Sequence, residues 1–303
     1  SAASDVYKRQ DATLPTVAMD TEAGTQYNVL HGYTSELDST LFYGNITPVA
    51  KDRKLTVTIN TYGEDIEGVA YKIRSLEDKS LIENTEVSDY DNAGSSINVT
   101  FNIKNLLDTG KEYALEIVLK TKKHEAVYYY TRIVYGVDYD LQKKLDFVMD
   151  FNACTFDDSR LKDISGYLET SSSGDNTNYG KVNINCSLSQ VGWGDLDPYV
   201  ESDIMPEVIS VDDDVAILRL SYRVGAANDY SSSDTYTVSE YYRIRQTNSG
   251  FYLLNFEREM NQVFDARNDL TSTAKINLGI NSSTDVNCCL LYTSPSPRDR
   301  TRS

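Results

Sequence analysis

Residues 55–65, LTVTINTYGED, set the fold class of this chain. Leu55, Val57 and Ile59 alternate with polar residues, and YGED at the end of the stretch has the composition of a turn. Successive side chains of a β-strand point to opposite faces of a sheet, so the alternation predicts a half-buried strand that leads into a hairpin or a short crossing. The chain therefore reads first as a β protein.

The same alternation recurs four times before residue 134, with turn residues such as DTG at 108–110 between the segments. Strands joined by short turns pair antiparallel, because a parallel connection needs a long crossover. Residues 11–137 are therefore expected to form an immunoglobulin-like or fibronectin-like β-sandwich. The alternating positions are Val69, Tyr71 and Ile73; Ile97, Val99, Phe101 and Ile103; Leu115, Ile117 and Leu119; and Val127, Tyr129, Thr131 and Ile133.

Helical spacing replaces this pattern after residue 137. One helix is predicted from about Leu141, with Asp138 or Asp140 as its N-cap, because apolar residues then recur at intervals of three and four. A second is predicted over 157–170 and ends in the polar loop 171–176. These helices are expected to form a connector that either caps the sandwich or packs on the region that follows.

Longer strands return beyond residue 180. Two hairpins are predicted, over 208–224 with the aspartates 212–214 as the turn and over 236–256 with TNSG at 247–250 as the turn. Hairpins in sequence order predict an antiparallel β-meander, and the first blades of a truncated β-propeller are one form that such a meander takes. We expect 138–287 to be a second domain, made of the helical connector and this meander.

The two ends of the chain resemble translated sequencing adapters. The first ten residues match the terminal bases of an adapter used in transposase-based libraries, and CLLYTSPSPRD near the other end matches its reverse complement and a second adapter arm. We expect 1–10 and 289–303 to be fusion scars. The codon of Cys288 would be partly adapter, so 288–303 is set aside and 11–287 is treated as the native piece of a metagenomic gene.

The charge of the chain is strongly negative. The formal net charge is −17, and since five of the 29 Lys and Arg and two of the 46 Asp and Glu lie in the terminal scars, 24 basic and 44 acidic residues remain. Such a charge repels nucleic-acid phosphates and anionic membrane surfaces. The expected partners are a protein or a cell-wall glycan, not a nucleic acid, with membrane attachment only through an N-terminal anchor missing from this piece.

The sequence holds no standard catalytic motif. HExxH, paired CxxC, GxSxG, the P-loop and GxGxxG are all missing, and the two histidines lie in expected turns. The two secure native cysteines, Cys154 and Cys186, form either a disulfide or two unpaired buried thiols, and they are not expected to be a catalytic pair because no cation lies near them in sequence. A non-enzymatic protein is favoured.

Two sets of residues are candidates for binding. One acidic cluster offers oxygen ligands of the kind that calcium takes, although its spacing is not that of an EF-hand; the alternative is a solvated loop and no cofactor. Aromatic rings on strand faces would stack on sugars or on a protein, and the alternative is aromatic pairing within a sheet. The calcium candidates are Asp195, Asp197, Glu201 and Asp203, and the aromatic candidates are Tyr128, Tyr130, Trp193 and Tyr241.

Four stretches of the native piece resemble a group of uncharacterised, membrane-anchored extracytoplasmic proteins of gut clostridia. They are ATLPTVAM at 12–19, NVLHGY at 28–33, SSGDNT at 172–177 and SLSQVGWGD at 187–195. The resemblance implies an N-terminal anchor and a bacterial cell-surface location, and it carries over no functional residue. We expect an extracytoplasmic interaction or scaffolding protein; the alternative is a carbohydrate-binding module or a fragment of a carbohydrate-active enzyme.

Overall fold

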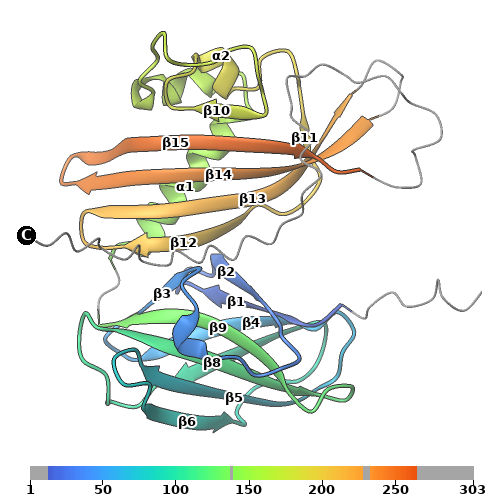
Figure 1. The fold of residues 1–303 in the computed structure, drawn as a ribbon, viewed down its shortest axis with the longest axis vertical. Coiled ribbons are helices and arrows are strands. Elements are labelled where there is room, and N and C mark those ends of the chain that lie inside the picture. Colours follow the sequence, from blue (N-terminus) through green and yellow to red (C-terminus); the bar gives the residue numbers. More distant parts are fainter. Residues whose placement is uncertain (1–12, 137–138, 228–232, 265–303) are drawn as a thin grey trace, which may run out of the picture.

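The strands of this chain form three sheets within the described residues (Figure 1). Sheets A and B face each other as a β-sandwich, and sheet C lies beside them with a helix across one of its faces. The fold is mainly β, as the alternating segments predicted. The computed structural model describes residues 13–136, 139–227 and 233–264, so the terminal segments 1–10 and 288–303 lie outside it.

The sandwich is built from nine strands of the described chain. Sheet A has the order β2-β1-β4-β7 and sheet B the order β3-β9-β8-β5-β6. Sheet A contains β1 (Thr16–Asp20), β2 (Gln26–His31), β4 (Lys54–Asn60) and β7 (Ser96–Asn102), and sheet B contains β3 (Ile46–Val49), β5 (Ile66–Ser75), β6 (Leu81–Val87), β8 (Glu112–Thr121) and β9 (Val127–Tyr135).

The predicted alternating residues form the core between the two sheets. Val57 pairs with Met19 of β1 on one side and Val99 of β7 on the other, and all three are fully buried. Tyr71 of sheet B stacks on Phe101 of sheet A with 4.6 Å between ring centroids. Burying one apolar face of each sheet against the other is what makes this pair of layers stable.

One strand pair of the sandwich differs from the expected hairpin-linked arrangement. β3 pairs parallel with β9, with Ile46 opposite Arg132 and Val49 opposite Tyr135. Pro48 lies within β3, which an edge strand tolerates because one side of its backbone needs no ladder donor. The long segment between β3 and β9 supplies the crossover that a parallel pair requires.

Sheet C is a meander, as predicted, in the order β10-β15-β14-β13-β11 with β12 also paired to β13. Helix α1 (Leu141–Thr155) crosses one face of it (Figure 1). The strands are β10 (Lys181–Asn183), β11 (Tyr199–Val200), β12 (Met205–Val211), β13 (Val215–Ala227), β14 (Ser233–Thr247) and β15 (Gly250–Gln262). The short helices are η2 (Ser39–Leu41), η3 (Leu161–Tyr167) and α2 (Leu188–Val191).

The two faces of sheet C have different surroundings. On β13 the even-numbered residues from Ala216 to Ala226 are buried, whereas Ser221 and Arg223 are exposed. The same alternation on β14 buries Tyr242 and leaves Arg243 exposed. The helical cover therefore lies on one face only, and the other is an open polar surface.

A buried asparagine joins the sandwich to sheet C. Asn28 lies at a bulge of β2 with φ of 49° and no exposed surface. Its Oδ1 accepts the N–H of Val208 on β12 (2.7 Å), and its Nδ2 donates to the carbonyl of Ile46 (2.9 Å) and to Thr47 Oγ1 (3.0 Å). Asparagine tolerates the left-handed region better than most residues, and its amide supplies a donor and an acceptor here.

Three details of the connector and meander differ from the sequence-based expectation. The helix predicted over 157–170 is the 3-10 helix η3, preceded by a turn in which Asp157 Oδ1 accepts the Ser159 N–H (3.0 Å). Asp140 is the N-cap of α1 but makes no capping hydrogen bond, and its carboxylate accepts from Gln246 Nε2 (2.9 Å). The described residues beyond the sandwich form a single six-stranded sheet, which is not the blade arrangement of a propeller.

Candidate functional site

An aromatic patch lies on the outer face of sheet B, where the segment 33–43 crosses the sheet. We define the patch as the exposed side chains of Tyr33, Leu37, Leu41 and Tyr43. Tyr43 is 69% exposed and Leu41 is 60% exposed, the highest values among the large hydrophobic side chains of the described residues. Exposed apolar side chains grouped in one segment are typical of an interaction surface.

The segment beneath the patch is held in place at several points. The N–H of Leu37 donates to the Tyr130 hydroxyl (2.7 Å), and Phe42 stacks on the Tyr130 ring at 4.4 Å. Arg132 Nε donates to the carbonyl of Phe42 (2.8 Å), and its guanidinium lies over the Tyr43 ring at 3.7 Å. A segment ordered in this way loses little conformational entropy when a partner binds.

An ion pair fixes the helical turn in the middle of the segment. Asp38 caps η2 by accepting the Thr40 N–H (3.0 Å), and its other oxygen pairs with Lys79 Nζ at 2.7 Å. The hydrogen bonds from Lys79 and Thr40 lower the pKa of Asp38 to about 2. The carboxylate therefore stays charged at neutral pH, and the turn keeps its cap.

The predicted aromatic residues of β9 lie under and beside this patch. Tyr130 is buried, because the segment 33–43 covers it, so the expectation that its ring is exposed is wrong. Tyr128 is half-buried, and its backbone pairs with that of Tyr33. The exposed side chains on this face of sheet B therefore come from the segment 33–43, which the sequence analysis did not single out.

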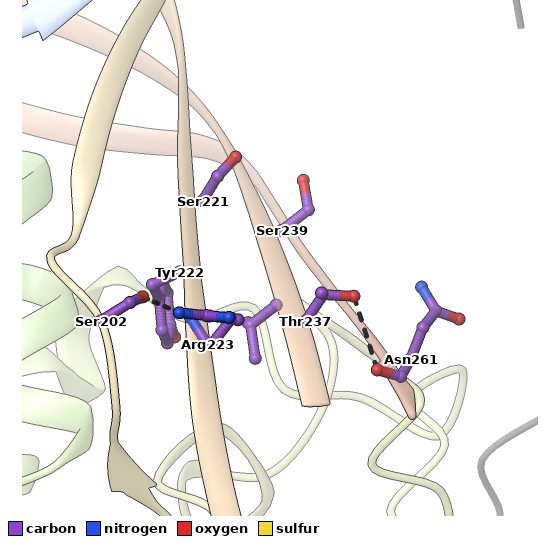
Figure 2. A pocket seen from close by; sticks show the side chains of 8 residues that line it. Ser202, Ser221, Tyr222, Arg223, Thr237, Ser239 and Asn261 are labelled. Atoms are coloured by element: carbon purple, nitrogen blue, oxygen red, sulfur yellow. Dashed lines mark hydrogen bonds between the residues drawn. The ribbon is translucent and has the colours of Figure 1, made fainter. Parts of the chain in front are cut away.

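A hollow of about 360 Å³, lined mostly by residues with polar side chains, lies on sheet C (Figure 2). Ser221 and Ser239 stand side by side on β13 and β14, next to Thr237, Asn261 and Arg223. The hollow exists because small side chains occupy adjacent strands there. Its lining also includes Ser202, Tyr222 and Val238.

Tyr241, another predicted contact residue, lies near this hollow on the open face. It is half-buried between Arg219 of β13 and Glu257 of β15. Tyr199 is 51% exposed and pairs with Gly225 at the end of the sheet. Tyr241 lies opposite Arg219 and Tyr199 opposite Gly225, so the two rings are six residues apart along β13, or roughly 20 Å. The two rings therefore do not converge on one groove.

Trp193 is buried on the covered side of sheet C, so the expectation that its ring is exposed is wrong. The guanidinium of Arg258 lies over its ring at 3.7 Å. Trp193 has φ of 71°, a backbone conformation that a bulky residue adopts only when its surroundings hold it there. Its two flanking glycines are typical of a loop, and no residue near Trp193 in the sequence indicates that Arg258 stacks on its ring.

Trp193 belongs to a buried polar cluster that the sequence analysis missed. Arg258 Nε pairs with Glu240 Oε2 at 2.8 Å, and both side chains are completely buried. Glu240 Oε1 accepts from Asn152 Nδ2 of α1 (2.6 Å) and from the Tyr242 hydroxyl (2.9 Å). Burial raises the pKa of Tyr242 well above its usual value, so this phenol stays protonated as a donor.

This cluster fixes the helical cover to sheet C. Arg258 Nη2 donates to the carbonyl of Val191 in α2 (2.8 Å), and Asn152 brings α1 to the same carboxylate. Arg258 Nη1 has no hydrogen-bond partner among the described residues. A completely buried ion pair of this kind is a structural link between layers.

The four acidic residues considered for calcium lie in one exposed region, where Glu201 Oε2 accepts from Thr235 Oγ1 (3.1 Å). Within 13–136, 139–227 and 233–264, no group of three or more His, Cys, Asp and Glu is arranged to hold a metal ion. The four are Asp195, Asp197, Glu201 and Asp203.

Cys154 and Cys186 are both free and buried. Burial raises the pKa of the Cys154 thiol, which lowers its reactivity as a nucleophile. Cys186 Sγ lies 3.3 Å from the carbonyl of Asp175 and 3.4 Å from the N–H of Asn183. The two thiols lie in different parts of the connector, Cys154 in α1 and Cys186 just before α2.

No family model matches the chain, and no curated protein is significantly similar to it. Among the described residues, no helix has both the length and the apolar character needed to cross a membrane.

Proposed function

We propose that this chain is a non-enzymatic interaction protein of a bacterial cell surface that binds a protein partner through the aromatic patch. The observation that carries the proposal is the grouping of Tyr33, Leu37, Leu41 and Tyr43 on a segment already ordered by Tyr130 and Arg132. Tyrosine and arginine are enriched among residues that dominate binding energy at protein interfaces. The resemblance of four stretches to extracytoplasmic proteins supports the proposed cell-surface location.

The charge around the patch indicates the kind of partner. Glu36 and Glu116 share Lys72, with Nζ at 3.2 and 3.5 Å from their carboxylates, so two acidic groups face one basic group beside the rings. The chain as a whole is acidic, with a net charge of −17. A partner with an apolar contact area and a neutral or basic rim is therefore favoured over an acidic one.

A comparative capture experiment tests this proposal. The full chain and the double variant Leu41→Ser/Tyr43→Ser are immobilised, exposed to a solubilised envelope fraction of a gut clostridium, and the bound proteins are quantified by mass spectrometry. We expect one protein to bind the full chain and its captured amount to fall roughly tenfold or more with the double variant, because Leu41 and Tyr43 are the two most exposed side chains of the patch.

The matched control is Tyr252→Ser, which removes a ring of similar exposure from sheet C, 56% against 69% for Tyr43. This control should retain the partner. Equal capture by the full chain and the double variant contradicts the proposal. So does hydrolysis of a glycan or peptide by the purified chain that disappears when a single carboxylate is substituted.

A further inference from the structure

The second surface of the molecule is the hollow on the open face of sheet C. We propose that it binds a short stretch of a neutral glycan, with Tyr199 stacking on a sugar ring at its edge. The hollow of about 360 Å³ lies at the lower end of the range of roughly 300–1,000 Å³ typical of small-molecule sites, which suits a few sugar rings rather than a folded partner. This site is separate from the aromatic patch and does not depend on it.

The hydrogen-bonding groups of the hollow match sugar hydroxyls. Within the described residues, the side chains of Ser221, Ser239, Asn261 and Arg223 have no hydrogen-bond partner in the protein. Serine hydroxyls and an asparagine amide both donate and accept, and a sugar hydroxyl also does both. An anion would need donors alone, so this mixed set favours a neutral polyhydroxyl ligand.

Other groups of the hollow are already used and shape its floor. Ser202 Oγ accepts the backbone N–H of Arg223 (2.8 Å), which ties the segment before β12 to β13 (Figure 2). Thr237 Oγ1 donates to the carbonyl of Asn261 (3.4 Å) across β14 and β15. The side chains that remain without a hydrogen-bond partner among the described residues, such as Ser221, Arg223 and Ser239, lie on strands, and the rigid sheet holds them in position.

The charges around the hollow are mixed in sign. Arg223 is the one cation in its lining, whereas Glu259 lies opposite Ser239 on β15 and Lys181 lies opposite Glu259 on β10. At the edge, Glu201 Oε2 accepts from Thr235 Oγ1 (3.1 Å). A polyanion would meet carboxylates on two sides, and a neutral chain would not.

Tyr199 supplies the stacking surface. Its ring covers Gly225, where an added Cβ would lie 2.3 Å from Tyr199 Cζ, so only glycine permits this close approach. Its hydroxyl donates to Ser233 Oγ (3.0 Å), which limits rotation of the side chain. Tyr199 is 51% exposed, and its partner Gly225 lies two residues along β13 from Arg223. Exposed rings beside polar groups are suited to hold the apolar face of a sugar.

Binding is tested on the full chain with cellohexaose, xylohexaose, mannohexaose and chitohexaose as neutral probes and polygalacturonate as the acidic probe. The dissociation constant of the probe that binds most strongly is then measured by titration calorimetry for the unmodified chain and for each variant. We expect at least one neutral probe to bind, and Tyr199→Ala and Ser221→Tyr each to weaken binding roughly tenfold or more, because the first removes the stacking ring and the second fills the hollow.

The matched control is Ser210→Tyr, an exposed serine on β12 of the same open face, which should bind like the unmodified chain. Leu41→Ser/Tyr43→Ser should also bind normally, which separates failure of this site from failure of the aromatic patch. Binding of no neutral probe, binding of polygalacturonate alone, or a Ser221→Tyr variant that binds as well as the unmodified chain overturns the proposal.

Discussion

The sandwich and sheet C bury their strands in different ways. Sheets A and B cover each other, and the residues that meet between them are apolar or aromatic, such as Val57, Val99 and Tyr71. Sheet C is covered by helices on one face only, and the core beneath them contains the ion pair of Glu240 and Arg258. In the sandwich, each sheet buries one face against the other sheet, whereas sheet C buries one face under helices. The two regions therefore expose different surfaces.

This difference separates the binding surfaces by chemistry. The sandwich has no free inner face, so its contact surface comes from the segment 33–43 laid across the outside of sheet B. Sheet C keeps one strand face in solvent, and its small polar residues form a hollow there. A covered sheet needs an added segment to make an apolar contact, whereas an open sheet presents its side chains directly.

The largest expected effect concerns the ion pair under the helical cover. Arg258→Met leaves Glu240 buried without its cation and should lower the free energy of unfolding by about 3–5 kcal/mol. Urea unfolding followed by fluorescence measures this directly, because Trp193 is the single tryptophan of the chain and stacks on Arg258.

Arg243→Met is the matched control, since Arg243 lies on the open face of the same sheet. An exposed substitution of this kind should change the free energy of unfolding by no more than about 0.5 kcal/mol. Equal losses for Arg258→Met and Arg243→Met would show that the two faces of sheet C do not differ energetically, and the comparison would fail.

An intermediate effect is expected at the junction between the two regions. Asn28→Ala removes the acceptor of the Val208 N–H and the donor to Ile46, and should cost about 1–3 kcal/mol of unfolding free energy for the buried groups left unpaired. Asn28→Gly removes the same hydrogen bonds but fits the left-handed backbone, so it should be less damaging by about 1 kcal/mol.

The measurement is urea unfolding with far-UV circular dichroism and tryptophan fluorescence recorded together. Because Asn28 contacts both regions, its loss should lower the midpoints from both probes. A variant that is as stable as the unmodified chain by both probes would show that the sandwich and sheet C are joined elsewhere.

The smallest effect is a pH dependence at the same junction. Burial is the main cause that raises the pKa of Glu207 above 4.5, opposed by Arg219, Asn45 and His31. A carboxyl with a raised folded pKa binds its proton more tightly in the folded state, so stability is greatest below 4.5 and decreases as the pH rises through the folded pKa.

Glu207→Gln should remove this decrease, which thermal unfolding between about pH 4 and pH 8 will show as a flatter curve of Tm against pH. Glu259→Gln, on an exposed position of sheet C, removes the same charge and should keep the slope of the unmodified chain. An unchanged slope in Glu207→Gln would mean that this carboxyl is not desolvated at the junction.

Much of the secondary structure could be predicted, because periodicity is a local property. The alternation of Leu55, Val57 and Ile59 is confirmed as β4, and the hairpins around 212–214 and 247–250 are confirmed as β12–β13 and β14–β15. The strands that were not predicted are β1, β2, β3, β6, β10 and β11. Of these, β3, β10 and β11 have only two to four residues, which show no reliable period. The helix over 157–170 was wrong because side-chain turns compete with helical hydrogen bonds.

The sequence by itself determined the β class, the main hairpins and the acidic character of the chain. Only the tertiary structure decided which aromatic rings reach solvent: Tyr130 is covered through a hydrogen bond to a residue 93 positions away, and Trp193 through a cation brought from β15. Likewise, Glu240 and Arg258 look like ordinary charged strand residues until helices close over them. Periodicity reports which face of a strand is inside, but exposure depends on what distant segments cover, and local pattern holds no information about that.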